Sequence, residues 1–365
     1  MAFNVIEKRL IDNATQKNIP ISGSIELLPL CNMDCNMCYV RLSRSEMEQQ
    51  GRLRTPEEWI NIGRQMLENS VLFVQITGGE PLLYRGFREV YLALKKFGIY
   101  VTLNTNGTLI DEVWADFFAH YKPRRINITL YGADSSVYRN LCHYEEGFDK
   151  TIRAIKLLRE RGVDVKINGS LVKANRKDLT KLLAMAKDLD APIHVDTYMY
   201  PATRERIKSY DWQCRLTPEE IAEADIEILK YDHTDEDFRS YVRAFLERAE
   251  HPEPVNESAG RMKCLAGRSS FFINWQGQMQ PCVMLPLFGA AIGEGGFAEA
   301  WRKISDRVKN VRLSQTCAGC SKRDVCTTCA ACALYESGSI DGTPDYMCRY
   351  TDQKIRRFQE ELKNE

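Results

Sequence analysis

The stretch Cys31-Asn32-Met33-Asp34-Cys35-Asn36-Met37-Cys38 places three cysteines within eight residues, with the spacing C-x3-C-x2-C. It follows the apolar run 24–30, which is typical of a buried strand. Three thiolates this close together suit three irons of a cubic [4Fe-4S] cluster, whose protein ligands are cysteine sulfurs. The fourth iron would then have no protein ligand, and it is where we expect chemistry to take place.

A structural zinc site is the alternative interpretation of these three cysteines. Structural zinc is held by four protein ligands, usually contributed by two C-x2-C pairs. No fourth cysteine or histidine lies near the triplet, and the nearest histidine along the chain is His120. The triplet therefore favours an iron–sulfur cluster over zinc.

A second motif, Gly78-Gly79-Glu80-Pro81, ends the apolar run 71–77. Glycines at the end of a buried strand let the backbone and one carboxylate approach a ligand closely. An ordinary turn is the alternative for this motif alone. Its place, one strand and one helix after the cysteines, favours a shared site.

Together the two motifs resemble those of the radical S-adenosylmethionine (SAM) superfamily. The resemblance implies that Cys31, Cys35 and Cys38 hold a [4Fe-4S] cluster whose fourth iron is chelated by the amino and carboxylate groups of SAM. It also implies that an electron cleaves the sulfonium to give a 5′-deoxyadenosyl radical. By the same resemblance, the carboxylate of Glu80 holds the methionyl ammonium of SAM.

The resemblance implies further SAM contacts from the ends of other strands. Met37 occupies the position where many relatives have an aromatic residue beside the adenine, and its backbone can still serve. Asn106 and Thr129 end two later strands, although turn chemistry explains Asn106-Gly107 equally well. The complete set of cofactor-binding candidates is Met37, Tyr39, Gly78, Gly79, Glu80, Asn106 and Thr129.

The sequence does not identify a catalytic acid, base or nucleophile. Many peptide-modifying relatives have an Arg-Gly pair between the fourth strand and the next helix, where this chain reads Tyr138-Arg-Asn-Leu-Cys142-His143. No SAM-binding arginine is therefore assigned there. Cys142 is the one candidate for a catalytic role, and a small buried hydrophobe is its more common role.

Apolar strands that lie one helix apart predict a parallel sheet covered by crossover helices. Six such units predict an α/β fold, a partial (β/α)6 TIM-like barrel, with its site at the carboxyl ends of the strands. The sequence Thr55-Pro56-Glu57-Glu58 predicts a capped helix start. The expected strands are 24–30, 71–77, 100–105, 125–131, 163–172 and 192–200, and the expected later helices are 87–97, 109–121, 148–161, 176–189, 217–232 and 235–250.

The last third of the chain contains a second group of cysteines. Cys264 and Cys282 have the spacing C-x12-G-x4-C, in which the aromatic strand 271–275 and Gly277 predict a hairpin. The group continues with Cys317-x2-Cys320-x5-Cys326-x2-Cys329-x2-Cys332 and ends at Cys348. A zinc ribbon built from two C-x2-C pairs is the alternative interpretation of the segment 317–329.

This second group resembles the SPASM extension of radical SAM enzymes, which holds two auxiliary [4Fe-4S] clusters. The resemblance implies that one cluster is closed by Cys317, Cys320, Cys326 and Cys348. The other cluster then takes Cys264, Cys282 and Cys329, with Cys332 as an alternative to Cys329 or as a fourth ligand. With three protein ligands, one iron is open to a substrate thiolate. The expected cofactors are three [4Fe-4S] clusters and SAM.

Length and composition set the expected organisation. The chain has 365 residues, 44% of them apolar, which suits one large and one small domain. We expect an N-terminal extension (1–23), a radical SAM core (24–232), a bridging helix and linker (233–263), a SPASM domain (264–348) and a C-terminal helix (349–365).

Charge and cysteine usage indicate the expected partners and compartment. The 50 basic residues balance the 50 acidic ones, which argues against nucleic acid or a membrane surface as the main partner. With no signal peptide and no membrane-length apolar run, we expect a cytoplasmic protein. Thirteen cysteines then indicate metal ligation, because the cytosol keeps thiols reduced.

The expected function is a radical SAM oxidoreductase that matures a ribosomally made precursor peptide through a thioether or carbon–carbon crosslink. Segment 1–23 is too short for a leader-binding domain, so a separate leader-binding protein is expected, besides an electron donor such as flavodoxin or ferredoxin. The alternative is a dehydrogenase that acts on a small-molecule alcohol or a protein side chain. Val283, which follows Cys282, disfavours the sulfatase-maturing subtype, whose members carry an aspartate there. An electron carrier or cluster scaffold would not need Gly78-Gly79-Glu80.

Overall fold

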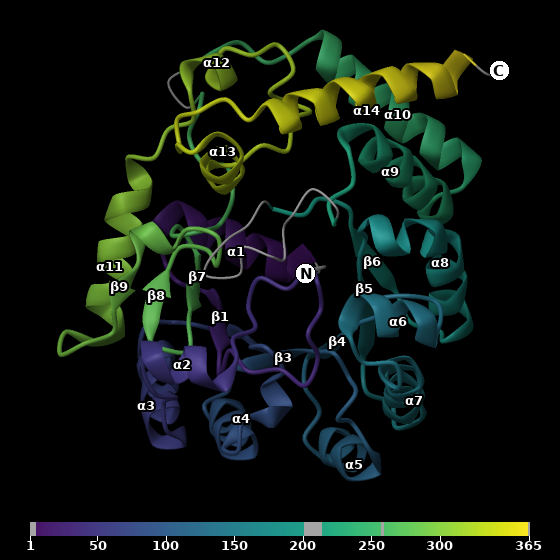
Figure 1. Ribbon diagram of the computed structural model, residues 1–365. Coiled ribbons are helices and arrows are strands. Elements are labelled where there is room, and N and C mark those ends of the chain that lie inside the picture. The colour runs from purple at the N-terminus through teal and green to yellow at the C-terminus, as the bar shows by residue number, and fades with distance from the viewer. Residues whose placement is uncertain (1–4, 201–213, 257–258, 364–365) are drawn as a thin grey trace. The chain divides into compact units, whose positions relative to one another are not determined.

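The computed structural model describes residues 5–200, 214–256 and 259–363, which form two compact units (Figure 1). The first unit comprises Met1–Leu130, Asp134–Asn168 and Cys264–Asn310, and the second comprises Tyr131–Ala133, Gly169–Lys263 and Val311–Glu365. The first unit thus contains the cysteine triplet together with Cys264 and Cys282. The boundary expected at Cys264 rests on the cysteine pattern, whereas this division follows the packing.

The first unit is built on a parallel sheet. Its strands are β1 (Ser22–Glu26), β2 (Phe73–Thr77), β3 (Tyr100–Thr105), β4 (Arg125–Thr129) and β5 (Val165–Ser170), and their order across the sheet follows the chain. The register places Ile25 opposite Ile76, and Ile76 opposite Leu103. The expected α/β fold, with a parallel sheet of the partial TIM-barrel kind, is confirmed.

The sheet also extends on the other side of β1. Strand β7 (Ser270–Ile273) pairs in parallel with β1, and the antiparallel strands β8 (Gln278–Gln280) and β9 (Ala290–Ala291) follow it. The expected hairpin at Gly277 is confirmed, and this glycine has the positive φ of 79° that such a turn requires. The pairing of β7 with β1 was not expected, because a strand of this length carries no signal for its partner.

The two faces of the sheet differ in polarity. Val74, Val101, Ile126 and Val165 are buried against the covering helices, and the residues that alternate with them along the strands are mostly polar. Figure 1 shows the helices α3 (Pro56–Glu68), α4 (Phe87–Lys96), α5 (Glu112–His120) and α7 (Gly147–Glu160) along the outer side of the strands. The polar side chains lie on the opposite, inner face.

Aromatic packing fixes two of these helices. Phe87 and Tyr91 of α4 contact Phe118 of α5, with ring centroids 6.2 and 5.8 Å apart. All three rings are fully buried, and burying a large apolar side chain contributes roughly 1.5 to 3 kcal/mol. The covering layer of helices therefore holds the strands whose ends carry the motifs.

Most expected elements are present with shifted ends. The strand expected at 192–200 is β6 (Ile193–Asp196), and the helix expected at 176–189 is α8 (Leu179–Asp188), preceded by a 3-10 turn. Helices not expected are α1 (Val5–Lys17), α2 (Arg44–Gln50), α6 (Ser135–Cys142), α11 (Gly296–Lys309), α12 (Gln315–Ala318) and α13 (Ala330–Ser337). Several of these helices are short, whereas α11 has a clear helical spacing of buried residues, Phe297, Trp301, Ile304 and Val308, that the sequence reasoning overlooked. Residues 201–213, which fall within the expected radical SAM core (24–232), lie outside the described residues.

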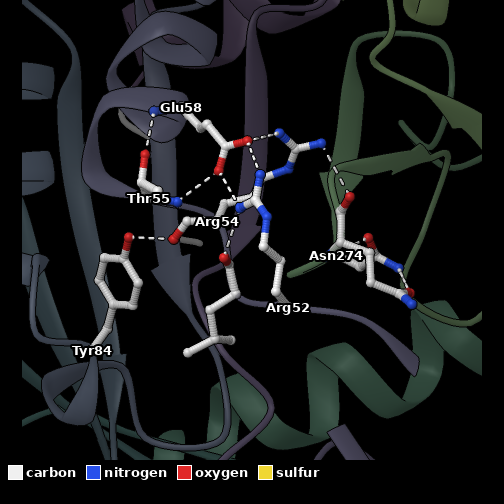
Figure 2. Close-up of polar contacts among 8 residues, drawn as sticks. Arg52, Arg54, Thr55, Glu58, Tyr84 and Asn274 are labelled. Carbon is white, nitrogen blue, oxygen red and sulfur yellow. Dashed lines mark hydrogen bonds and ion pairs between the residues drawn. The ribbon is translucent and has the colours of Figure 1, made fainter. Parts of the chain in front are cut away.

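A polar network ties the β7–β8 hairpin to the start of α3 (Figure 2). The Arg54 guanidinium donates to the carbonyl of Gln276 at 3.1 Å, and the Tyr84 hydroxyl donates to the Arg54 carbonyl at 2.6 Å. Thr55 and Glu58 form the capping box expected from their sequence. The hairpin that leads to Cys282 is thus held to the rest of the first unit by side chains as well as by the pairing of β7 with β1.

The second unit is largely helical. Its long helices are α9 (Pro218–Asp232), α10 (Asp235–Glu250) and α14 (Asp345–Lys363), and α10 has the expected bounds. Phe238, Phe245 and Phe358 form their buried core. Lys354 pairs with Asp225 at 2.7 Å, which joins α14 to α9. No helix among the described residues is both long and apolar enough to cross a membrane.

Candidate active site at the carboxyl ends of the strands

Residues 31–38, the cysteine loop, follow β1 and are held by hydrogen bonds from other elements. The carbonyls of Cys142 and Leu141, at the end of α6, accept the amides of Asp34 and Asn36 at 3.1 and 2.9 Å. His143 Nε2 lies 2.8 Å from Asn36 Oδ1. The last carbonyls of a helix need partners beyond the helix, and the cysteine loop supplies them.

The two glycines of the Gly-Gly-Glu motif accommodate this same loop. The amide of Gly79 donates to the Leu28 carbonyl at 2.8 Å, and that of Glu80 donates to the Leu30 carbonyl at 2.9 Å. A Cβ atom on Gly79 would lie only 2.3 Å from the Leu30 carbonyl oxygen. Glycine is therefore required because the backbone that leads into the cysteine loop passes directly over it.

Glu80 is a fully buried carboxylate (0% exposed) next to that loop. It accepts the amide of Leu82 at 3.1 Å, the amide of Asn106 at 2.9 Å, and the hydroxyl of Thr105, which lies 2.8 and 2.9 Å from its two oxygens. A carboxylate offers about four acceptor positions, so roughly one remains for a ligand donor. Burial raises the pKa of Glu80 from 4.5 to about 7, although the three donors oppose this rise.

Asn106 connects Glu80 to the cysteine loop. Its side chain is buried (5% exposed), and its Nδ2 donates to Asn32 Oδ1 at 2.9 Å and lies 3.6 Å from Cys31 Sγ. Asn32 Nδ2 in turn donates to Thr108 Oγ1 at 2.8 Å. The candidate SAM-binding residues Glu80 and Asn106 thus lie beside Cys31, as the order of the motifs predicts.

The three thiols of the loop lie close enough to affect one another. Burial raises the pKa of Cys31, and the nearby charges of Glu80, Cys38 and Cys35 raise it further. Backbone amides also point at the sulfurs: the amide of Met33 is 3.4 Å from Cys31 Sγ. Among the described residues, no three His, Cys, Asp or Glu side chains are gathered tightly enough to ligate a single metal ion. The ligands of a cubic cluster bind separate irons.

The remaining candidate residues of the first unit differ in how deeply they are buried. Met37 is buried, Tyr39 is half-buried, and Thr129 is half-buried at the end of β4, opposite Asn168 of β5. The Cys142 side chain is fully buried (0% exposed), and its carbonyl holds the cysteine loop. Cys264 is exposed and Cys282 is half-buried.

Three thiols of the second unit lie close enough to Cys348 to affect its pKa. Burial raises the pKa of Cys348, and the thiols of Cys326, Cys317 and Cys320 raise it further. These are the four cysteines for which the SPASM resemblance implies a shared auxiliary cluster, and that assignment stays a prediction. The amide of Lys322 also donates to Cys320 Sγ at 3.4 Å.

Cys329 and Cys332 form a second thiol pair in this unit. Their sulfurs are 3.6 Å apart, and the Tyr200 hydroxyl lies 3.7 Å from Cys329 and 3.8 Å from Cys332. The hydrogen bond from Cys332 lowers the pKa of Cys329 to about 6 and raises that of Cys332. Cys264 and Cys282 belong to the first unit, so the ligand set that joins them to Cys329 stays a prediction.

Sequence reasoning missed several residues of these sites. Thr105 donates to both oxygens of Glu80, Asn32 bridges Asn106 and Thr108, and Tyr200 approaches both thiols. Thr105 and Asn32 are immediate neighbours of residues already singled out, so their position was a usable signal. Tyr200 offered no such signal, because only the fold brings it to Cys329.

A parallel α/β sheet whose strand ends carry three cysteines and a buried acid defines a cofactor-dependent enzyme with a partial-barrel core. Residues 25–186 match the sequence model of the Radical SAM superfamily, and this region is a radical SAM domain. The resemblance seen in the cysteine triplet and the Gly-Gly-Glu motif is thereby confirmed, and the chain contains a domain of that superfamily.

The chain is similar to proteins with different activities. It is 24% identical over 350 residues to the AdoMet-dependent heme synthase of Methanosarcina barkeri, covering 88% of this chain and 94% of that protein. It is 25% identical over 278 residues to the subtilosin biosynthesis protein AlbA of Bacillus subtilis, covering 73% and 56% of the two chains. The crystal structure of Streptococcus suis SuiB bound to the precursor peptide SuiA shares its fold, with a TM-score of 0.70, 19% identity and coverage of 95% and 84%.

Proposed function

We propose that this protein is a radical SAM oxidoreductase that matures a ribosomally made peptide by closing a thioether or carbon–carbon crosslink. The observation that carries the cofactor part is the hydrogen-bonded path from Glu80 through Asn106 to Cys31. This path joins an acid suited to an ammonium group with a thiol suited to iron. Both ends belong to the first unit and to the matched domain.

The residues present fit the proposed cofactors. Cys31, Cys35 and Cys38 lie within electrostatic range of one another, and backbone amides approach the sulfurs of Cys31 and Cys38. Glu80 keeps about one acceptor position for the methionyl ammonium. A bound cation would also favour its ionised form and lower its pKa.

When bound, the cluster and SAM supply a 5′-deoxyadenosyl radical that removes a hydrogen atom from the substrate. The residues of this chain orient the cofactors and the substrate and exclude water from the site. Glu80 fixes the amino end of SAM, and the carbonyls at the end of α6 hold the cysteine loop in one conformation. Thr129 and the polar inner face of the sheet, which includes Asn104 and Asn168, are proposed to contact SAM and substrate.

Two similarities support a peptide as the substrate. AlbA is named for the biosynthesis of subtilosin, a bacteriocin, and SuiB was solved with its precursor peptide SuiA. The fold match to SuiB extends over 95% of this chain. A separate leader-binding protein and an electron donor of the flavodoxin or ferredoxin type complete the proposal.

The C-terminal cysteines support two auxiliary [4Fe-4S] clusters of SPASM type. Cys317, Cys320, Cys326 and Cys348 are proposed to close one of them, in line with the effect of the first three thiols on the pKa of Cys348. Cys264, Cys282 and Cys329 are proposed for the other, with Cys332 as the alternative or the fourth ligand. An open iron there would bind a substrate thiolate, which suits thioether formation.

A second candidate is the conversion of a heme precursor. The similarity to the heme synthase covers 94% of that protein, whereas the similarity to AlbA covers 56% of AlbA. Mass spectrometry separates the two candidates. The peptide proposal expects a short cysteine-containing peptide, encoded beside this gene and co-expressed with the enzyme, to lose two hydrogen atoms per crosslink. Conversion of a heme precursor without any change in that peptide would favour the second candidate.

The SAM cleavage that both candidates require is tested separately. Replacing Cys31, Cys35 and Cys38 together by alanine should abolish formation of 5′-deoxyadenosine under reducing conditions, while the iron of the C-terminal clusters remains. Replacing Cys317 and Cys320 is the matched control, because SAM cleavage should persist in that variant. Undiminished cleavage in the triple variant would overturn the assignment.

Glu80→Gln tests the proposed ammonium contact. The loss of a charge-assisted hydrogen bond costs roughly 1.5 to 3 kcal/mol, so the affinity for SAM should fall about tenfold or more. The affinity of the wild type should also weaken as the pH falls through about 7, where Glu80 becomes protonated. Isothermal titration with SAM measures both, and an unchanged dissociation constant would show that the motif only shapes the backbone.

A further inference from the structure

The orientation of the Asn106 amide is fixed by its neighbours. The backbone amide of Thr108 lies 2.9 Å from one terminal atom of this side chain, and a backbone amide can only donate. That atom is therefore the oxygen Oδ1, and the other terminal atom is the donor Nδ2. The Thr108 hydroxyl, 2.7 Å from the same oxygen, fits this assignment.

The donor end of Asn106 faces the cysteine loop. Nδ2 lies 2.9 Å from Asn32 Oδ1 and 3.6 Å from Cys31 Sγ, so its two hydrogens have one acceptor each. Asn106 is 5% exposed, and little water competes for these contacts. The amide is thus built to donate to a sulfur that carries negative charge.

The same residue is bonded to Glu80 by its backbone. The amide of Asn106 donates to Glu80 Oε2 at 2.9 Å, and the Asn106 carbonyl accepts the hydroxyl of the fully buried Thr151 at 3.0 Å. The backbone of residue 106 is therefore held at both its N–H and its C=O group, which fixes where the side chain starts. A substitution at residue 106 changes the contact to Cys31 and leaves the backbone donor to Glu80 in place.

We propose that Asn106 is a positioning residue that sets the reduction potential of the SAM-binding cluster through its hydrogen bond to Cys31 Sγ. This inference rests on the proposed function, because it needs a cluster on Cys31, Cys35 and Cys38. It assigns to Asn106 a role toward the iron, in addition to the contact with SAM expected from the sequence.

The physical reason is the change of charge on the sulfur. When the cluster takes up one electron, negative charge on its thiolate ligands increases, and an N–H donor stabilises the reduced form more than the oxidised form. Hydrogen bonds to the sulfurs are one of the factors that set the potentials of iron–sulfur clusters. The amide of Met33 also donates to Cys31, but no side-chain substitution removes that bond. Asn106 is therefore the side chain through which the effect is measurable.

The test is a redox titration of the reconstituted protein with dithionite, followed by electron paramagnetic resonance. The signal of this cluster is identified as the one absent from the Cys31, Cys35 and Cys38 triple alanine variant. Asn106→Leu removes the donor at similar size, and Asn106→Asp removes the donor while keeping the acceptor for Thr108. Thr108→Val is the matched control, because it removes a hydroxyl from the same network and keeps the donor to Cys31.

Both variants of Asn106 should lower the equilibrium constant for one-electron reduction by about tenfold, a downward shift of about 59 mV, whereas Thr108→Val should leave it unchanged. A shift of equal size in Thr108→Val would show that loop geometry is responsible and would overturn the inference. A shift in Asn106→Asp alone would assign the effect to the added charge and would overturn it as well.

The proposed function fails in a different way. If the triple alanine variant keeps every iron–sulfur signal of the wild type, no cluster is bound at the loop, and both the proposed function and this inference are wrong. If the signal is lost there but the potentials of both Asn106 variants equal that of the wild type, the inference alone is wrong.

Discussion

The cysteine loop and the C-terminal cysteine segment, residues 317–348, hold their thiols in different ways. In the cysteine loop, the amides of Asp34 and Asn36 donate to the end of α6, more than 100 positions away in the chain. In the C-terminal segment, the amides of Cys317, Cys320 and Cys326 donate to acceptors within four residues. For the proposed clusters, this difference implies that the fold orders the cysteine loop before iron binds, whereas the C-terminal segment depends more on the metal.

The largest effect that this comparison predicts follows iron removal. Chelation should increase exchange of the amides of Cys317, Cys320 and Cys326 on the order of 100-fold or more, because these amides donate only to local acceptors and their order depends on the metal. The amides of Asp34 and Asn36 should keep most of their protection. Hydrogen exchange of iron-loaded and iron-free protein measures both regions in the same sample. Equal loss of protection in the two regions would contradict the comparison.

Gly79→Ala tests the support of the cysteine loop directly. The added Cβ would lie 2.3 Å from the Leu30 carbonyl oxygen and 2.9 Å from that of Pro29, so the backbone of the loop must shift. We expect a loss of roughly 3 kcal/mol in the free energy of unfolding, at the upper end for overpacking. Gly293→Ala is the matched control, because a Cβ there has no neighbour within 4 Å. Denaturant unfolding measures both, and equal stability of the two variants would show that the loop is pliable.

The pH dependence of stability tests the burial of Glu80. Its pKa is about 7 in the folded protein and near 4.5 when exposed, so its contribution is fully present below pH 4.5 and is lost as the pH rises through 7. The shift corresponds to roughly 3 kcal/mol as an upper value, which solvent relaxation would reduce to about 2. In SAM-free protein, the unfolding free energy of the wild type minus that of Glu80→Gln should fall by this amount between pH 4.5 and 7.5. Parallel curves would mean that Glu80 stays ionised.

The smallest effect concerns the hairpin that leads to Cys282. Arg54→Ala removes the bond to the Gln276 carbonyl, and one such hydrogen bond contributes about 1 kcal/mol. Arg52→Ala should cost less, because this exposed side chain bonds to Glu58 and to the carbonyl of the adjacent Leu53 at the surface. Thermal unfolding of the two variants gives the comparison. A larger loss for Arg52→Ala would mean that the hairpin is held by β7 alone.

The sequence allowed much of the first unit to be predicted, for identifiable physical reasons. The strand–helix alternation and the capping box at Thr55 are local patterns, and both are confirmed. The approach of Glu80 and Asn106 to Cys31 followed from the rule that parallel strand ends meet at one edge. The support of the cysteine loop by α6 was not predicted, because every residue has a backbone carbonyl and the sequence gives no signal of which ones accept a long-range hydrogen bond. The pairing of β7 with β1 depends on contacts nearly 250 positions apart, which no local pattern encodes.

That pairing has a consequence for any attempt to isolate the radical SAM domain as a fragment. β1 lies between β2 and β7, and Ile25 is opposite Ile273. A chain cut after residue 232 or 263 would lose β7 and leave one row of the β1 backbone donors and acceptors unpaired. Unpaired edges of this kind recruit strands from other molecules. Such a fragment should therefore aggregate. The radical SAM core should fold stably only when the chain that carries it also includes β7.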